Sequence, residues 1–222
     1  FVVIMTNTDE NSTVYSRDVL EFVTVAVQYC AYLETLDTKT RQEFVGTLLK
    51  LLPLLYLKAS LLNDNGINND EDMWAEEPEQ FVTEENYEII RNNIAYIMGE
   101  QDDYLDVFVE DMKYSDRPIL RTVSEELADI YQDIKNFAYA YKIGTDETMQ
   151  AALSACNENF KTYWGQKLVN VMRALHDVKY NPNNEAEDDG CCCDDDDDCC
   201  SHHEDHCSHH GEGECTCGHH HH

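Results

Sequence analysis

The last 32 residues of the chain, 191–222, contain almost none of the side chains that build a hydrophobic core. They begin with three cysteines, five aspartates and two further cysteines, and they continue in histidines, glycines and acidic residues. Because this stretch has no apolar surface to bury and its negative charges repel one another, we expect it to be disordered in the absence of a metal ion. We therefore divide the chain into a folded domain, 14–179, and a low-complexity Cys/His/Asp-rich tail, 180–222.

The composition of the tail indicates transition-metal binding. Eight of the ten cysteines and nine of the ten histidines lie in it, and no Lys or Arg follows Lys179. Thiolate and imidazole are preferred ligands of zinc, Cu(I) and nickel, and four of them complete a tetrahedral zinc site. We expect zinc, with nickel or Cu(I) as alternatives. The candidate metal ligands are Cys191, Cys192, Cys193, Cys199, Cys200, His202, His203, His206, Cys207, His209, His210, Cys215 and Cys217.

The spacing of these ligands favours adaptable binding over one folded zinc finger. Cys191 and Cys193 form a closely spaced thiolate pair, but the C-x2–4-C…H-x3–5-H unit of a zinc finger is absent. In composition the tail resembles the His- and Cys-rich tails of nickel and zinc chaperones and of a prolyl isomerase. Two alternatives stay open: residues 218–222 can be the remnant of a purification tag, and the whole tail can be a low-complexity segment without a selected role.

The charge of the chain restricts its partners. The net charge is −30, of which −13 lies in residues 183–222 and the remaining −17 in the preceding residues. This acidity argues against nucleic acids and anionic membranes as partners and favours metal cations or a basic protein surface. No apolar run reaches the roughly 18–20 residues that span a bilayer. We expect a cytoplasmic protein that starts at Met5 and keeps its cysteines reduced. The alternative interpretation of the opening residues is a degenerate signal peptide.

Apolar residues at helical spacing predict an all-α domain of five to six helices packed as a bundle. Leu54–Leu62, apolar on most sides, is expected to be buried, and Glu100–Asp116 to be irregular apart from a short turn. The polar loop 63–72 lacks the spacing of a calcium loop, so no calcium site is expected there. The first predicted helix is 16–36 with Ser16 as N-cap, and the second starts at Thr38 with a kink or break at Pro53. The third is 83–98 and ends at Gly99. The fourth runs from Pro118 to Ile143 and is capped by Ser115 or Asp116, and the last runs from Thr145 or Asp146 to about Leu175.

The domain has few residues of chemical interest. The acidic row Glu125, Glu126, Asp129 and Asp133 is interpreted as a solvated helix face, and Cys30 as a small buried hydrophobe. No nucleophile–base pair occurs in the domain, so catalysis is not expected. A second group of polar and aromatic side chains is expected to form a hydrogen-bond network between helices, with a ligand site as the alternative; it comprises Asp129, Tyr131, Asp133, Tyr163, Lys167 and Arg173.

Four segments carry a resemblance to a known family: EFVTVAVQYCAYLE, LLPLLYLKASLL, LADIYQDIKNFAYAY and YWGQKLVNVMRALH. Over about residues 15–178 the chain resembles domain of unknown function 5063, a bacterial helical family met mainly in gut and oral Bacteroidetes. The resemblance implies a compact, helical, cytoplasmic domain. It implies no established activity and no catalytic residue, and it does not extend to the tail.

Two functions follow as expectations. The first is a protein that binds, buffers or delivers transition-metal ions through its tail. The second is a helical protein–protein interaction module with an acidic surface and no catalytic activity. In either case the domain should fold without metal, because it carries its own apolar stripes and helix caps and almost no metal ligands.

Overall fold

The computed structural model describes residues 13–36, 38–62, 80–106 and 119–181. The predicted metal ligands 191–217 and the polar loop 63–72 therefore lie outside the described residues. The described residues up to Lys179 belong to one compact unit. Its elements are η1 (Thr13–Tyr15), α1 (Arg17–Leu33), α2 (Arg41–Ser60), α3 (Glu84–Met98), η4 (Gly99–Asp102), β1 (Asp103–Asp106), β2 (Ile119–Thr122), α4 (Val123–Ile143), α5 (Asp146–Asn159), the π-helical turn η6 (Phe160–Trp164) and α6 (Gly165–Tyr180).

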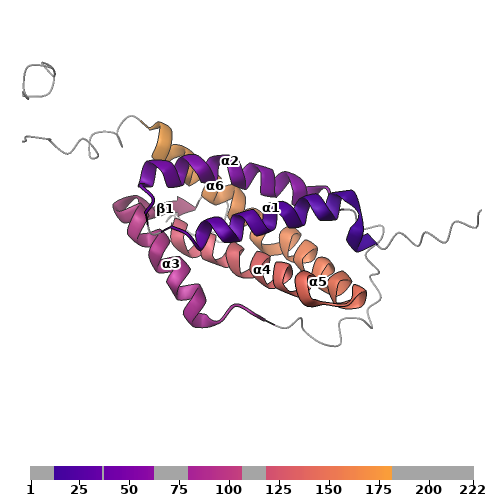
Figure 1. Cartoon of the computed structure of the whole chain (residues 1–222). Coiled ribbons are helices and arrows are strands. Elements are labelled where there is room, and N and C mark those ends of the chain that lie inside the picture. Colours follow the sequence, from indigo (N-terminus) through magenta and orange to yellow (C-terminus); the bar gives the residue numbers. More distant parts are fainter. Residues whose placement is uncertain (1–12, 37, 63–79, 107–118, 182–222) are drawn as a thin grey trace, which may run out of the picture. The chain divides into compact units, whose positions relative to one another are not determined.

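Helix α4 organises the unit. It packs against α1, α3 and α5, while α2 lies alongside α1 (Figure 1). The core between these helices holds the fully buried side chains Trp164, Tyr29, Phe22 and Phe44. The Tyr29 hydroxyl donates to the backbone carbonyl of Leu127 at 2.9 Å, so that even the polar end of this core residue is paired. The prediction of an all-α domain is confirmed for the described residues, with one small addition.

That addition is a two-stranded antiparallel ribbon, β1 with β2. The sequence analysis predicted no strand, an irregular segment over β1, and a helix beginning at Pro118 where β2 lies, so it was wrong at both places. Helix α4 instead starts after Thr122, whose side chain accepts from the Glu125 N–H at 3.3 Å. Asp102 reinforces this start, because its two carboxylate oxygens accept from the N–H and hydroxyl of Ser124 at 2.8 and 2.6 Å.

Local capping signals placed most other helix ends. Ser16, Thr83 and Thr145 cap α1, α3 and α5, each with its side-chain oxygen accepting a backbone N–H three residues on. Gly99 ends α3 at φ 55°, a conformation that a residue with a Cβ rarely adopts. Helix α2 begins later than predicted, after Thr40, which forms a capping box with Glu43.

Proline does not break α2. The helix runs from Arg41 through Pro53 to Ser60, so the predicted possibility of two separate helices is wrong. Pro53 is exposed, whereas Leu48, Leu52 and Leu55 on either side of it are completely buried. Burial of these leucines holds both halves of α2 on the core despite the backbone hydrogen bond that proline cannot donate.

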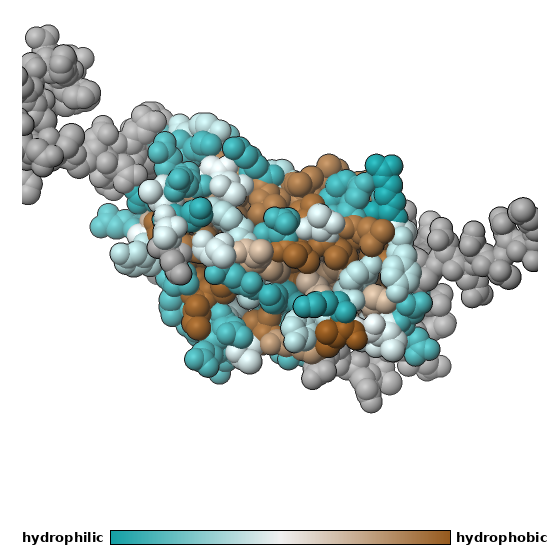
Figure 2. Space-filling view, in the orientation of Figure 1, coloured by the Kyte–Doolittle hydropathy of each residue, from teal (hydrophilic) through white to brown (hydrophobic). Residues whose placement is uncertain are grey.

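The C-terminal half of α2 also differs from prediction. Leu54, Leu57 and Leu61 are 41–50% exposed, so the segment is buried on one side only. The helix keeps Leu55 and Ala59 in the core and presents the remaining apolar side chains outward. An apolar surface therefore lies over α1 and α2, where brown side chains gather in Figure 2.

The predicted last helix is two helices joined by η6. At this turn the Gly165 N–H bonds to the carbonyl oxygen of Phe160, five residues back, instead of four. A Cβ on Gly165 would lie 2.3 Å from that oxygen, so glycine is required by close approach. The extra residue changes which side of the following helix faces the core and places Trp164 there, its indole N–H donating to the Cys156 carbonyl at 3.1 Å.

Candidate functional site

Asp129 of α4 is the centre of a polar cluster between three helices. Its carboxylate accepts from the Tyr87 hydroxyl of α3 at 2.8 Å, from the Tyr163 hydroxyl of η6 at 3.0 Å and from the Lys167 ammonium of α6 at 2.8 Å. The Asp129 and Lys167 side chains are only 15% and 16% exposed. The ammonium also lies 4.9 Å from the centre of the Tyr163 ring. We call these four residues the Asp129 cluster.

The electrostatics of the cluster follow from its partial burial. Burial lowers the pKa of Lys167, but the hydrogen bond to Asp129 and its negative charge outweigh burial and raise that pKa overall. Burial and the hydrogen bond to Asp129 raise the pKa of Tyr87. Lysine is therefore charged and tyrosine neutral at physiological pH, which is the state in which all three partners donate to the carboxylate.

One turn before Asp129, Glu126 is almost completely buried, with 3% exposure. The hydroxyl of Tyr104, on β1, donates to its carboxylate. Burial raises the pKa of Glu126, and the Tyr104 hydrogen bond opposes that rise without cancelling it. Burying this carboxylate costs free energy of folding, and the hydrogen bond from the Tyr104 hydroxyl offsets only part of that cost.

The interpretation of the acidic row as a solvated face was therefore wrong for most of its members. Glu125 is exposed, but Glu126 is buried, and Asp129 and Asp133 are partly covered. Asp133 accepts from the Asn159 side-chain amide of α5 at 2.8 Å, and burial raises its pKa. The row faces α3, α5 and α6, because α4 is central in the unit and has neighbours on several sides.

The predicted inter-helix network exists in part. Asp129, Tyr163 and Lys167 meet as described above, and Asp133 lies one turn further along α4. Tyr131 points to the end of a different helix, where its hydroxyl donates to Glu34, the C-cap of α1, at 2.8 Å; Lys135 donates to the same Glu34 oxygen at 2.5 Å. Arg173 belongs to neither group and lines a cavity.

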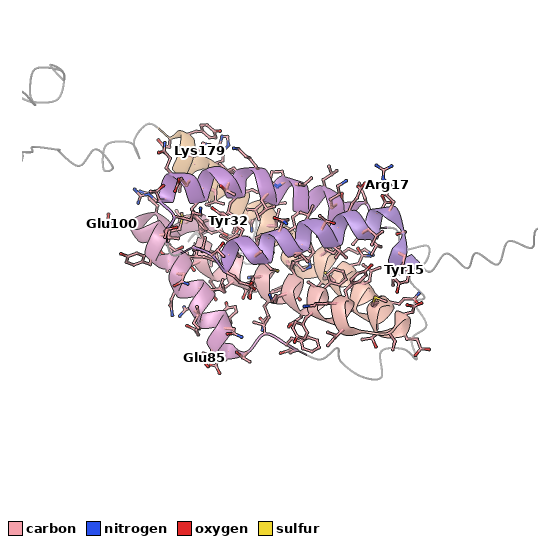
Figure 3. All side chains as sticks on the ribbon, viewed as in Figure 1. Tyr15, Arg17, Tyr32, Glu85, Glu100 and Lys179 are labelled. Atoms are coloured by element: carbon pink, nitrogen blue, oxygen red, sulfur yellow. The ribbon has the colours of Figure 1, made fainter. Side chains whose placement is uncertain are left out.

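The cavity has a volume of about 490 Å³ and lies between Gln101 of η4, strand β1 and helix α6. Glu100, the neighbour of Gln101 in the chain, lies at the same end of the helical unit as Lys179 of α6, whereas Tyr15 lies at the other end (Figure 3). Tyr104 joins the cavity to the buried Glu126, because it lines the former and bonds to the latter. The ionisable residues of the cavity wall are Asp103, Asp106, Arg173, His176 and Asp177.

No metal centre forms in the part of the chain that the structure describes, where no group of three His, Cys, Asp or Glu is placed to hold an ion. Cys30 and Cys156 are buried at 2% and 4% exposure. Burial raises the pKa of the Cys30 thiol to about 12, which leaves almost no thiolate at neutral pH. The interpretation of Cys30 as a small buried hydrophobe is confirmed.

Sequence reasoning missed Tyr87, Tyr104 and Asp106. Tyr87 is separated from Asp129 by 42 residues and Tyr104 from Glu126 by 22, so their pairing depends on tertiary packing. A weak signal existed at β1, where Tyr104 and Asp106 alternate with the exposed Asp103 and Leu105 in the pattern of a short strand.

Within the described residues, no helix is sufficiently long and apolar to cross a bilayer.

Comparison with known proteins agrees with this fold. Protein BF1032 from Bacteroides fragilis, known from a structural-genomics crystal structure, is 49% identical to the chain with a TM-score of 0.65; the match covers 77% of this chain and 97% of that one. No protein with a curated description matches significantly. The model of the family described as domain of unknown function DUF5063 matches residues 13–181, a span that contains the whole Asp129 cluster and the cavity wall. The chain belongs to the DUF5063 family.

Proposed function

We propose that this DUF5063 protein binds transition-metal ions through its tail and buffers or delivers them in the cytoplasm. One observation carries the proposal: eight cysteines and nine histidines are gathered in residues 191–222, with no competing Lys or Arg after Lys179. Zinc is the expected ion, and nickel and Cu(I) are the alternatives, because imidazole and thiolate ligands suit all three.

Both cysteines of the domain are buried, and its described residues offer no group of three metal ligands. The proposal therefore assigns the metal sites to the tail. Seventeen ligands, eight Cys and nine His, accommodate at most about four tetrahedral ions. Because thiols and imidazoles must lose protons to bind, metal uptake falls as the pH is lowered.

Metal titration of the reduced protein tests the proposal. The full chain, a chain ending at residue 182 and a chain lacking only residues 218–222 are each titrated with zinc, Cu(I) and nickel. The proposal expects several ions per full chain, none per chain ending at residue 182, and nearly full capacity without the last five residues. Equal metal stoichiometry for the full chain and the chain ending at residue 182 would contradict metal binding by the tail. If deleting residues 218–222 alone abolishes metal binding, the site is no more than a histidine tag.

A second function, a protein–protein interaction module, is favoured by the apolar surface over α1 and α2. Leu20 and Val27 of α1 are each 46% exposed, and Leu57 of α2 is 50% exposed. Adjoining exposed apolar side chains on an acidic protein suit a partner with an apolar contact area and a basic rim.

A matched pair of substitutions tests this second function. Leu57→Glu changes the apolar surface, and Leu120→Glu changes an equally apolar side chain that is 61% exposed on β2. A partner captured by the wild type and by the Leu120 variant, lost with the Leu57 variant and weakened by salt, supports the module. Capture that survives Leu57→Glu, or that requires the tail and metal, contradicts it.

A further inference from the structure

The outward side of α2 carries an apolar stripe at helical spacing. Leu54, Leu57 and the C-cap residue Leu61 follow one another at intervals of three or four residues, and each is 41–50% exposed. They lie on the side of the helix opposite Leu52 and Leu55, which are completely buried. This is the spacing of a seam along which a second helix can pack.

Helix α1 adds a second row beside this stripe. Leu20 and Val27, each 46% exposed, lie about two helical turns apart. The Lys58 ammonium of α2 bonds to the Glu21 carboxylate of α1 at 2.5 Å, so the two helices are joined side by side. Apolar side chains accordingly form one surface over both helices in Figure 2.

The size of this surface is that of a protein interface. Helix α2 has 20 residues and is about 30 Å long, and two adjacent helices are about 20 Å wide, which gives about 600 Å². Stable complexes bury roughly 800 Å² on each partner. The apolar surface is therefore large enough for a reversible protein contact.

Charge distribution favours a second copy of the chain as the partner. No Asp or Glu occurs in α1 after Glu21 or in α2 after Glu43, whereas α2 carries Lys50 and Lys58 there. Two copies of a chain with a net charge of −30 repel each other least where carboxylates are absent. A second copy also presents an apolar contact area with lysines at its rim, which is the partner chemistry inferred above for the interaction module.

The stripe is complementary to itself when two α2 helices pack antiparallel. A two-fold axis at the middle of the stripe sets Leu54 of one copy against Leu57 of the other, and the exposed Lys50 against Leu61 of the other. The C-terminal end of a helix carries a partial negative charge, which attracts an ammonium group. Apolar contacts at the centre are thus combined with a favourable charge interaction at each end.

We propose that the chain forms a homodimer through the apolar surface over α1 and α2, with the two α2 helices antiparallel. This inference rests on the interaction module proposed above and names its partner. It is separate from metal binding by the tail, because the surface contains none of the candidate metal ligands.

Analytical ultracentrifugation of the full chain over micromolar to submillimolar concentrations tests the proposal. A reductant and a chelator are present, so that neither disulfides nor bridging metal ions between tails join two chains. The proposal expects a reversible monomer–dimer equilibrium with a dissociation constant on the order of 10 µM. A chain that stays monomeric throughout overturns the homodimer and leaves the interaction module with a different partner, which the capture experiment detects separately.

Two matched pairs of substitutions locate the interface. Leu57→Glu is expected to weaken dimerisation by about a hundredfold or more, because it places a carboxylate at the centre of the seam on both copies. Leu120→Glu on β2, at a position that is also exposed, is expected to leave dimerisation nearly unchanged. Lys50→Glu is expected to weaken dimerisation about tenfold more than Lys142→Glu, which changes the net charge equally at an exposed position of α4.

Unchanged helical circular dichroism of the four variants verifies that each one is folded. Dimerisation that survives Leu57→Glu, or that is weakened equally by Leu57→Glu and Leu120→Glu, places the contact elsewhere and overturns the proposal. Equal effects of the two lysine variants contradict the antiparallel arrangement and likewise overturn it.

Discussion

Replacing Asp129 by Asn tests whether the Asp129 cluster holds α3, α4 and α6 together. The substitution keeps the size of the side chain and an oxygen acceptor, but it removes the charge that three donors share. Lys167, 16% exposed, then keeps its charge with no carboxylate at 2.8 Å. The Tyr163 ring 4.9 Å away compensates only in part.

The magnitude follows from the burial of the pair. Breaking a fully buried ion pair costs about 3–5 kcal/mol, and residual solvent access at this pair lowers the expected cost to about 2–3 kcal/mol. For a unit of this size, that loss lowers the thermal midpoint by about 5–10 °C. The comparison is Glu88→Gln in α3, which breaks the Arg91–Glu88 pair, 40% and 43% exposed, and is expected to cost less than about 0.5 kcal/mol.

Urea unfolding of both variants, together with Lys167→Met and the double variant, provides the measurement. The double variant is expected to be more stable than the sum of the two single losses predicts, because removing both partners leaves no unpaired buried charge. A loss below about 0.5 kcal/mol for Asp129→Asn, or strict additivity with Lys167→Met, would refute the assignment of a coupled cluster.

Three further predictions concern the turn, the buried acid and the metal. Gly165→Ala, whose Cβ would meet the Phe160 oxygen at 2.3 Å, should cost about 1–3 kcal/mol in urea unfolding, whereas Gly46→Ala, 3.6 Å from its nearest neighbour, should be neutral or stabilising by up to about 1 kcal/mol. The pKa of Glu126 is higher in the folded protein than its unfolded value of 4.5. Its ionised form therefore destabilises the fold at pH values above the folded-state pKa, and this destabilisation disappears as the pH falls toward 4.5. Glu126→Gln should therefore gain stability relative to wild type at pH 7 and lose that advantage near pH 4; an advantage independent of pH would contradict this. A chelator should leave the helical circular dichroism and the thermal midpoint nearly unchanged, and a large loss of helicity would place the metal within the domain.

The features predicted from sequence are those that depend on neighbouring residues. Ser16 and Gly99 define helix ends through contacts within four residues, and the sequence analysis placed both. Local signals were sufficient there because the same turn of helix contains both the cap and the group it satisfies.

The errors have a common physical origin in contacts that join distant segments. Strand β1 pairs with β2, where Arg121 is the partner of Tyr104. Asp129 and Glu126 were misplaced on the surface because an acidic residue on a helix is normally solvated, and the tyrosines that satisfy them come from other elements. The π-turn at Gly165 likewise depends on how Trp164 packs.

Tyr104 makes the cavity and the buried acid interdependent. Its ring lines the cavity and its hydroxyl donates to Glu126, which is 3% exposed. A ligand that displaced this ring would remove the hydrogen bond and leave the carboxylate with the desolvation cost of an unpaired acceptor. A ligand that packed against the ring without moving it would preserve the bond. Of the two, the second is favoured energetically, because it leaves the hydrogen bond between Tyr104 and Glu126 intact.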